Sequence, residues 1–155
     1  MNKCILFFAM LISVFCTSCL KSGLEDIENS SLCEISSVTM EHRWIIKNSN
    51  GYDQLSRQQL TLSNKNPNDK KELFFSITVP KASSTFPSSE RDNVSLDKLY
   101  MIMVISPAAK ITPLNGAPVL GMPEKYELGK KYEYKVTAAN GESSIYTIMI
   151  EDFIK

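Results

Sequence analysis

The amino-acid sequence predicts an all-β protein from two kinds of pattern. Apolar and polar residues alternate with a period of two in several short segments, as they do in strands buried on one face. Turn formers such as Asn-Gly and Pro separate these segments, and no segment carries apolar residues at helical spacing. This series of short strands predicts an immunoglobulin-like β-sandwich of about seven strands, although periodicity leaves the strand order open.

Residues 1–18 have the three parts of an export signal peptide. Lys3 supplies the positive charge, a short apolar core runs from Ile5 to Phe15, and Thr17-Ser18 supplies small residues at the end. The apolar run is shorter than the roughly 20 residues that a membrane-spanning helix needs. We therefore predict that residues 1–18 are removed during export.

Cys19 follows the two small residues directly. This arrangement resembles the lipobox of bacterial lipoproteins, in which the thiol is acylated and the cysteine becomes the new amino terminus. The alternative is an ordinary secretory signal with an incidental cysteine. The resemblance implies that Cys19 carries lipid and that a membrane is a partner of the protein. The expected location is then the cell envelope, as an outer-membrane lipoprotein that is either internal or exposed at the cell surface.

The cysteine count agrees with this interpretation. Of the four cysteines, Cys4 and Cys16 would leave with the signal and Cys19 would carry lipid. Only Cys33 remains in the folded part, so we expect no intrachain disulfide. Cys33 is expected to act as a small buried hydrophobe rather than as a nucleophile.

The exported chain divides into a tether and one domain. Residues 19–32 are polar and acidic, which is typical of a tether, and residues 33–155 have the length of a single sandwich domain. Removing Lys3 from the 17 basic residues leaves 16 against 17 acidic ones, a formal charge of −1. With no excess of positive charge, we expect no nucleic-acid partner.

Seven segments of the domain are predicted to be strands. They cover residues 35–47, 57–63, 73–79, 99–105, 110–112, 132–138 and 146–150. The segment 99–105 is apolar throughout, which predicts a strand covered on both faces. The others alternate or are short, and we expect them to bury one face.

The connections carry their own signals. Asn140-Gly141 predicts a type I′ turn in the last hairpin, because both central residues of that turn take positive φ. Residues 87–91 predict one helical turn with Ser88 as its cap, and Phe86 is expected to pin this loop to the body.

Three segments resemble a known family. They are residues 111–118 (Ile-Thr-Pro-Leu-Asn-Gly-Ala-Pro), 134–141 (Tyr-Lys-Val-Thr-Ala-Ala-Asn-Gly) and 19–24 (Cys-Leu-Lys-Ser-Gly-Leu). Together they resemble an uncharacterised Bacteroidetes lipoprotein family with an immunoglobulin-like domain of unknown function, and the resemblance covers nearly the whole exported chain. It implies an envelope location and a sandwich fold, and it assigns no catalytic residue. Some relatives occur in surface glycan-handling or adhesin proteins, which implies a context only.

Aromatic residues are the candidate ligand-binding residues. Tyr132 and Tyr134 share one face of the last hairpin, and with Trp44 and Tyr146 they could form a stacking platform for sugar rings. The same spacing is equally typical of core packing between strands.

Other chemistry finds little support in the sequence. His42 is the only histidine, so we expect a satisfied strand histidine, no metal and no cofactor. The Asn-rich segment 64–69 could offer oxygens to calcium, but it departs from the EF-hand pattern, and an Asx turn explains it as well. No nucleophile elbow, phosphate-binding glycine loop or acid–base pair is recognisable, so we expect no enzyme.

These observations predict a lipid-anchored cell-envelope protein that acts as a non-catalytic binding or assembly module. An accessory carbohydrate-binding surface lipoprotein and a subunit of an adhesive surface fibre are the alternatives. The expected partner, besides the membrane, is a glycan or another envelope protein. A fibre subunit would require an open edge strand.

Overall fold

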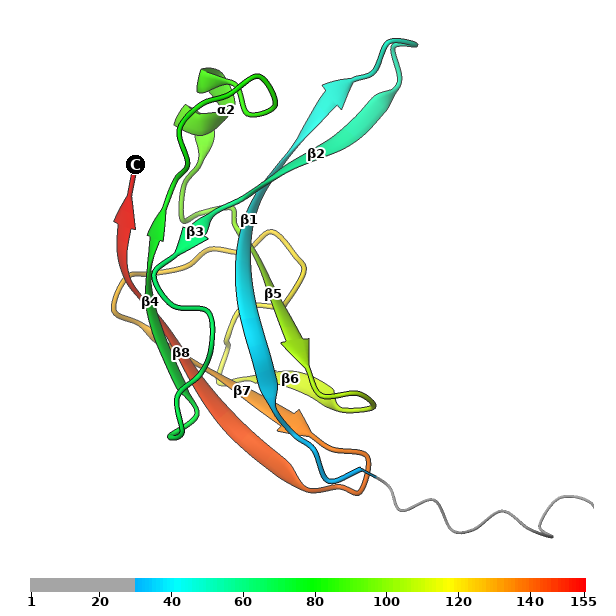
Figure 1. The fold of residues 1–155 in the computed structure, drawn as a ribbon, viewed down its shortest axis with the longest axis vertical. Coiled ribbons are helices and arrows are strands. Elements are labelled where there is room, and N and C mark those ends of the chain that lie inside the picture. The colour runs from blue at the N-terminus through cyan, green and yellow to red at the C-terminus, as the bar shows by residue number, and fades with distance from the viewer. Residues whose placement is uncertain (1–29) are drawn as a thin grey trace, which may run out of the picture.

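The computed structural model describes residues 30–155, which fold as two β-sheets packed face to face (Figure 1). The predicted β-sandwich is confirmed. The predicted signal peptide, Cys19 and most of the tether lie outside the described residues. The elements are β1 (Ile35–Lys47), β2 (Asp53–Gln59), β3 (Thr61–Leu62), β4 (Glu72–Thr78), α2 (Ser88–Asn93), β5 (Tyr100–Ile105), β6 (Lys110–Leu114), β7 (Lys131–Thr137) and β8 (Ser143–Ile154).

The strand order mixes neighbours from distant parts of the chain. The three-stranded sheet has the order β2-β1-β5, and the five-stranded sheet has the order β3-β4-β8-β7-β6. All pairs are antiparallel except β4 and β8, which are parallel and place Leu73 opposite Ile148. This parallel pair joins the middle of the domain to its carboxyl end.

The core lies between the two sheets and is built by the alternating residues. Val38 and Met40 of β1 face Phe75 of β4 and Ile148 of β8 across the sandwich, and all four are fully buried. Burying side chains of this size contributes roughly 1.5–3 kcal/mol each. The pattern that predicted half-buried strands is therefore the pattern that fills the core.

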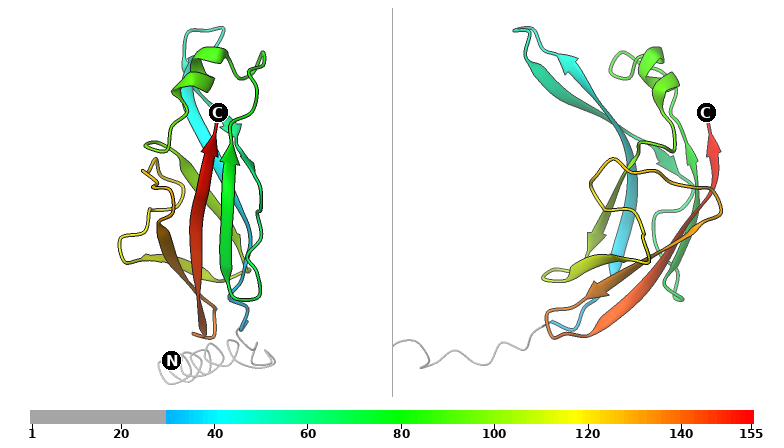
Figure 2. Two further views of the ribbon diagram at one scale, coloured as in Figure 1. Left: turned by 90° about the vertical axis from the view of Figure 1, so that its left-hand side faces the viewer. Right: turned by 180° about the vertical axis from the view of Figure 1, so that it is seen from behind.

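The two ends of the sandwich differ. Ser30 lies at the end formed by the β7–β8 turn, where Asn140 N donates to Ser30 O at 3.2 Å. The β1–β2 hairpin and α2 lie at the opposite end (Figures 1 and 2). Strand β1 connects the ends, and its 13 residues span about 40 Å at roughly 3.3 Å per residue.

The prediction that residues 99–105 are covered on both faces is wrong. Met101 is fully buried, whereas the side chain of Val104 is 54% exposed. The reason is the place of β5 in the molecule: it is an edge strand of a sheet with only one face packed against the other sheet. The continuous apolar sequence therefore did not indicate that the second face of β5 is open to solvent.

The last hairpin is confirmed, but its predicted turn type is wrong. Gly141 has φ of +93°, whereas the non-glycine residues with positive φ in the range 30–155 are Lys71, Ala108 and Asn115. Gly141 N donates to Ala138 O at 3.1 Å, and Ala138 N donates to Glu142 O at 2.8 Å. These bonds describe a type I turn followed by a glycine bulge, which needs positive φ only at the glycine.

The predicted helical turn near residue 87 is confirmed as α2, but its predicted cap is wrong. Pro87 occupies the cap position with extended backbone, and Ser88 is the first helical residue. Phe86 is fully buried and pins the preceding loop to the body as expected. No helix within residues 30–155 has the length and apolar character needed to cross a membrane.

Candidate functional site

An open groove of about 290 Å³ lies at the end of the sandwich that carries the β1–β2 hairpin. One wall comes from this hairpin and the other from the loop that leads into α2, two segments about forty residues apart in sequence. The lining residues are Trp44, Ile46, Ser56, Ser84, Thr85 and Pro87. The aromatic and aliphatic groups provide an apolar floor, and the hydroxyl groups lie around it.

The indole of Trp44 is held in place by neighbouring rings. Strand alternation puts His42, Trp44 and Ile46 on the same face of β1. The rings of His42 and Trp44 stack with centroids 5.5 Å apart and planes inclined by 21°. The ring of Phe86 lies 5.7 Å from that of Trp44, at 44°. Because Phe86 is fully buried, this cluster is a rigid support for Trp44.

His42 also connects the hairpin to α2. It is 6% exposed, and its Nε2 lies 3.3 Å from Oε2 of Glu90 in the helix. Arg91, the next residue, donates from Nε to Pro80 O at 3.1 Å. The structure thus agrees with the expectation that His42 is a satisfied strand histidine. Its interaction with Glu90 keeps the second wall of the groove close to the first.

No residue that lines the groove carries a charge. Thr85 Oγ1 lies 3.2 Å from Ser83 Oγ, so this hydroxyl already has one partner. The hydroxyls of Ser56 and Ser84 have no hydrogen-bond partner within residues 30–155, and both are at the groove. A neutral ligand with an apolar face and several hydroxyl or amide groups matches such a lining.

The strand pattern predicts Trp44 as a candidate, but no pattern in the sequence indicates the opposite wall. Ser84, Thr85 and Pro87 belong to an irregular, serine-rich segment, where periodicity gives no indication of position. Phe86 was the one useful signal in this segment. If Phe86 is buried in the core, its sequence neighbours Thr85 and Pro87 must lie at the surface close to it. Only folding brings this segment next to β1.

The β1–β2 hairpin also exposes apolar side chains. Ile45 and Leu55 lie directly opposite one another and are 60% and 57% exposed. Tyr52, in the turn, is 71% exposed. The hairpin extends beyond the region where the second sheet covers the first (Figure 1), and the face that carries Ile45 and Leu55 meets solvent.

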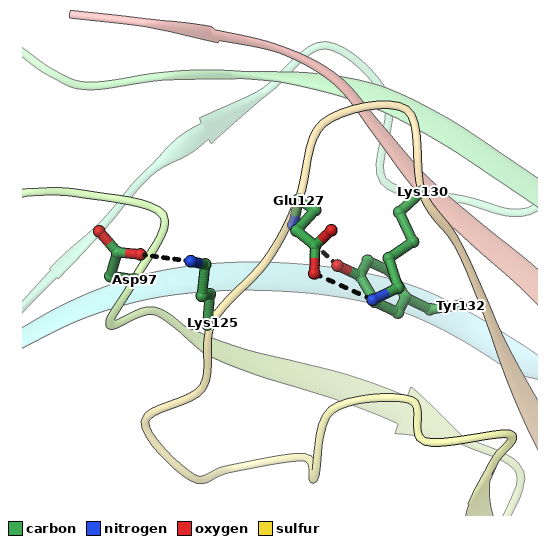
Figure 3. Close-up of polar contacts among 5 residues, drawn as sticks. All are labelled: Asp97, Lys125, Glu127, Lys130 and Tyr132. Carbon is green, nitrogen blue, oxygen red and sulfur yellow. Dashed lines mark hydrogen bonds and ion pairs between the residues drawn. The ribbon is translucent and has the colours of Figure 1, made fainter.

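Tyr132 does not form part of a surface platform. It is 3% exposed, and its hydroxyl oxygen accepts a hydrogen bond from Glu127 N at 2.7 Å (Figure 3). Its ring packs edge-on against Tyr126, with centroids 5.8 Å apart. Outside it, Lys130 and Glu127 form an exposed ion pair at 2.9 Å, which raises the pKa of Lys130 and lowers the pKa of Glu127.

Tyr134 is fully buried as well. Its hydroxyl donates to Pro118 O at 2.9 Å, and this bond ties the loop that follows β6 to the body of the domain. Desolvation by burial, together with the nearby Tyr126, raises the pKa of Tyr134 far above its ordinary value. The sequence-based suggestion that Tyr132 and Tyr134 bind a ligand is corrected here: both rings are core residues and neither presents a face to a sugar.

Tyr146 and Cys33 meet at the other end of the sandwich. Tyr146 is 4% exposed and donates from its hydroxyl to Cys33 O at 3.3 Å. Burial raises the pKa of Tyr146. Cys33 is free and half-buried, and its Sγ lies 3.0 Å from Ser144 Oγ. Through these contacts, Tyr146 and Cys33 close the core at this end of the sandwich.

The Asn-rich loop uses its amide oxygens internally. Asn68 Oδ1 accepts from Lys70 N and Glu72 N, both at 2.9 Å, as in an Asx turn. Asn64 Oδ1 accepts from Asn66 N at 3.3 Å. Within residues 30–155 there is no group of three or more His, Cys, Asp or Glu side chains that could hold a metal ion.

Comparisons with known proteins address the family and the fold. The model of the DUF5018-related family matches residues 35–149. A crystal structure of a "putative secreted protein" from Bacteroides fragilis NCTC 9343 is similar, with 29% sequence identity and a TM-score of 0.70. That similarity covers 80% of this chain and 97% of the other. No curated protein matches the sequence.

Proposed function

The chain belongs to the DUF5018-related family, and we propose that it is a lipid-anchored, non-catalytic binding module of the bacterial cell envelope. The lipobox-like sequence ending at Cys19 supports the anchor. The similarity to a Bacteroides fragilis protein described as secreted supports export of this chain. The binding role is supported by the groove beside Trp44.

The position of the groove carries this proposal. A lipid on Cys19 would hold the chain by its amino-terminal side, and Ser30 lies at the end of the sandwich away from the β1–β2 hairpin. The groove lies at the hairpin end, about 30 Å along β1 from Ile35 to Trp44. A ligand would therefore meet the protein at the end directed away from its attachment.

The ligand that fits the groove best is a neutral sugar ring. The carbon face of a pyranose is apolar and stacks on an indole, while its hydroxyl groups form hydrogen bonds at the rim. Trp44 offers the indole, and Ser56 and Ser84 offer hydroxyl groups on opposite walls. The absence of charge from the lining residues favours a neutral sugar over an acidic one.

A non-catalytic role is supported by the surroundings of His42. This imidazole stacks on Trp44 and interacts with Glu90, and no hydroxyl or thiol within residues 30–155 hydrogen-bonds to it. A histidine that acts as a general base needs a nucleophile within hydrogen-bond reach. Here the imidazole supports the groove wall.

Glycan-array binding by the full chain, solubilised in detergent, tests the proposal. Trp44→Ala removes the stacking surface, and Ser56→Leu, directly across from Trp44, fills the groove beside the indole while keeping every aromatic ring. We expect both variants to lose binding that the wild type shows. Tyr52→Ala is the matched control, because Tyr52 is an exposed aromatic of the same hairpin outside the groove, and it should bind normally. No binding by the wild type, or equal binding by all variants, contradicts the sugar proposal.

A further inference from the structure

The outer side of β2 is open. In the order β2-β1-β5, β2 has a strand on one side only. Leu60 N donates to Met40 O, and Asn48 N donates to Tyr52 O, both at 2.9 Å. Because hydrogen-bonded pairs alternate along an antiparallel ladder, the even-numbered residues of β2 bond to β1 and the odd-numbered ones face outward.

Asp53, Leu55 and Arg57 therefore direct their backbone N–H and C=O groups away from β1. These groups have no hydrogen-bond partner within residues 30–155. Strand β2 contains no proline or lysine, and its pairing with β1 runs without a bulge. Proline, lysine and a bulge, three features by which proteins block an exposed edge, are thus missing from β2, and its charged residues are one acid and one base.

The sequence of this edge is complementary to itself. If two copies of β2 lie antiparallel with Leu55 opposite Leu55, then Asp53 of each copy lies opposite Arg57 of the other. Within the chain, Asp53 forms an exposed ion pair with Lys47, and Arg57 lies 3.7 Å from Glu41. The side chains of Asp53 and Arg57 nevertheless remain 64% and 69% exposed, so each can exchange a weak surface contact for one with a second copy. Opposite charges directly across an antiparallel pair stabilise it, and like charges destabilise it.

We propose that two copies of this chain pair through β2, antiparallel, with the two Leu55 residues at the two-fold axis. The outward N–H and C=O groups of Asp53, Leu55 and Arg57 then bond to those of the second copy. The two three-stranded sheets become one sheet of six strands. The exposed Ile45 and Leu55 of both copies form a continuous apolar row on one face.

This pairing is closed. The same surface is used on both copies, so each β2 is fully occupied after one association and the product is a dimer, not a fibre. Trp44 and Ser56 lie on the opposite face of the hairpin from Leu55, so the grooves stay accessible. Three strand spacings separate the two Trp44 residues, about 15 Å, which suits bivalent binding. The inference itself rests on the edge of β2 and not on the ligand.

A cysteine at the two-fold axis tests the register in the full chain within intact envelopes. In a hydrogen-bonded pair the Cα atoms lie about 5.5 Å apart, within the range that a disulfide spans. We expect Leu55→Cys to form a disulfide-linked dimer under mild oxidation. Ile45→Cys is the control, since Ile45 is equally exposed on the neighbouring strand but would lie about 15 Å from its copy. It should stay monomeric, as should the wild type.

Charge reversal provides an independent variant. Arg57→Asp, added to Leu55→Cys, places carboxylates opposite one another, and we expect the dimer band to be lost. Adding Asp53→Arg to that variant restores opposite charges and should restore the band. Absence of a Leu55→Cys dimer, equal crosslinking of Ile45→Cys, or indifference to Arg57→Asp would overturn the proposal. If the Leu55→Cys chain does not crosslink but still binds glycans, the dimer is rejected and the proposed binding function is supported.

Discussion

At the scale of single residues, the tyrosines illustrate how burial changes the role of a side chain. Tyr126 and Tyr134 are almost fully buried, and desolvation raises the pKa of each hydroxyl far above the ordinary value of 10.0. Only the neutral hydroxyl is compatible with these sites. Alternation in β7 predicted that Tyr134 shares a face with Tyr132, and the second sheet decided that this face is the inner one.

Stability should therefore fall at alkaline pH. Unfolded tyrosines lose their protons near pH 10, whereas buried Tyr126 and Tyr134 keep theirs because their folded pKa is raised. The free energy of unfolding is then unaffected below pH 10 and decreases above it, by about 1.4 kcal/mol per pH unit for each such tyrosine. Urea unfolding at pH 8, 10 and 11 measures this slope.

Tyr134→Phe is the control for the alkaline effect. It keeps the ring but removes the hydroxyl and its bond to Pro118 O, which should cost about 1 kcal/mol at pH 8. Above pH 10, the free energy of unfolding should fall less steeply with pH, because one of the buried tyrosines no longer contributes. An unchanged slope would show that Tyr134 does not contribute to the alkaline loss.

At the scale of elements, β5 shows that an apolar sequence does not establish two-sided burial. Met101 lies in the core and Val104 lies on the open face of an edge strand, although the sequence between 99 and 105 is apolar throughout. Tyr100 on that open face is covered by Arg43, whose guanidinium lies 4.4 Å from the ring centroid. Contacts of this kind keep an apolar face soluble without a second layer.

Threonine substitutions at two positions of β5, Met101 and Val104, should lower the free energy of unfolding by very different amounts. Met101→Thr leaves a cavity and buries a hydroxyl, so we expect a loss of about 3 kcal/mol in the free energy of unfolding. Val104→Thr keeps the β-branched shape at a half-exposed site and should change it by less than about 0.5 kcal/mol. Chemical denaturation measures both. Similar losses would indicate that the outer face of β5 is covered after all.

At the scale of the whole molecule, Ser30 and the groove lie at opposite ends, and the proposed lipid on Cys19 would attach the protein on the side of Ser30. Ser30 lies beside the β7–β8 turn, and Trp44 lies on the β1–β2 hairpin, partly buried against the other end of the core. A sandwich held in this way presents its hairpin end to the surroundings, and pairing through β2 would present two grooves together. The proposed anchor is the part of this arrangement that a single substitution would remove.

Replacing Cys19 by Ala should transfer the protein from the membrane fraction to the soluble fraction. Each buried methylene of an acyl chain contributes about 0.8 kcal/mol, so loss of the lipid removes the main attraction to the membrane. Fractionation followed by immunoblotting measures the distribution. Cys16→Ala is the matched control and should remain in the membrane fraction, because bulky Phe15 precedes it and disfavours that cysteine as the acylated one. Membrane retention of Cys19→Ala would contradict the anchor.

Much of the fold could be predicted because the signals that specify strands are local. Val38 and Met40 alternate with polar residues along β1, and both are core residues, as are Phe75 and Ile77 of β4. Gly141 marked a hairpin that is present, although the turn type differs. The candidate site was predicted less well. Trp44, whose alternation with Met40 is also typical of a core residue, is half-buried and lines the groove, whereas Tyr132 and Tyr134, the predicted ligand-binding residues, are buried.

The sequence by itself predicted most of the strands and turns, because these depend on neighbours within a few positions. It predicted one strand at 57–63, where the structure has β2 (Asp53–Gln59) and β3 (Thr61–Leu62). Only the tertiary structure decided that β4 pairs in parallel with β8, that Tyr134 faces inward and that Ser84 lies across from Trp44. Alternation distinguishes the two faces of a strand but does not say which one a second sheet covers. Pairing over long sequence separations depends on the packing of the whole core, which no local pattern contains.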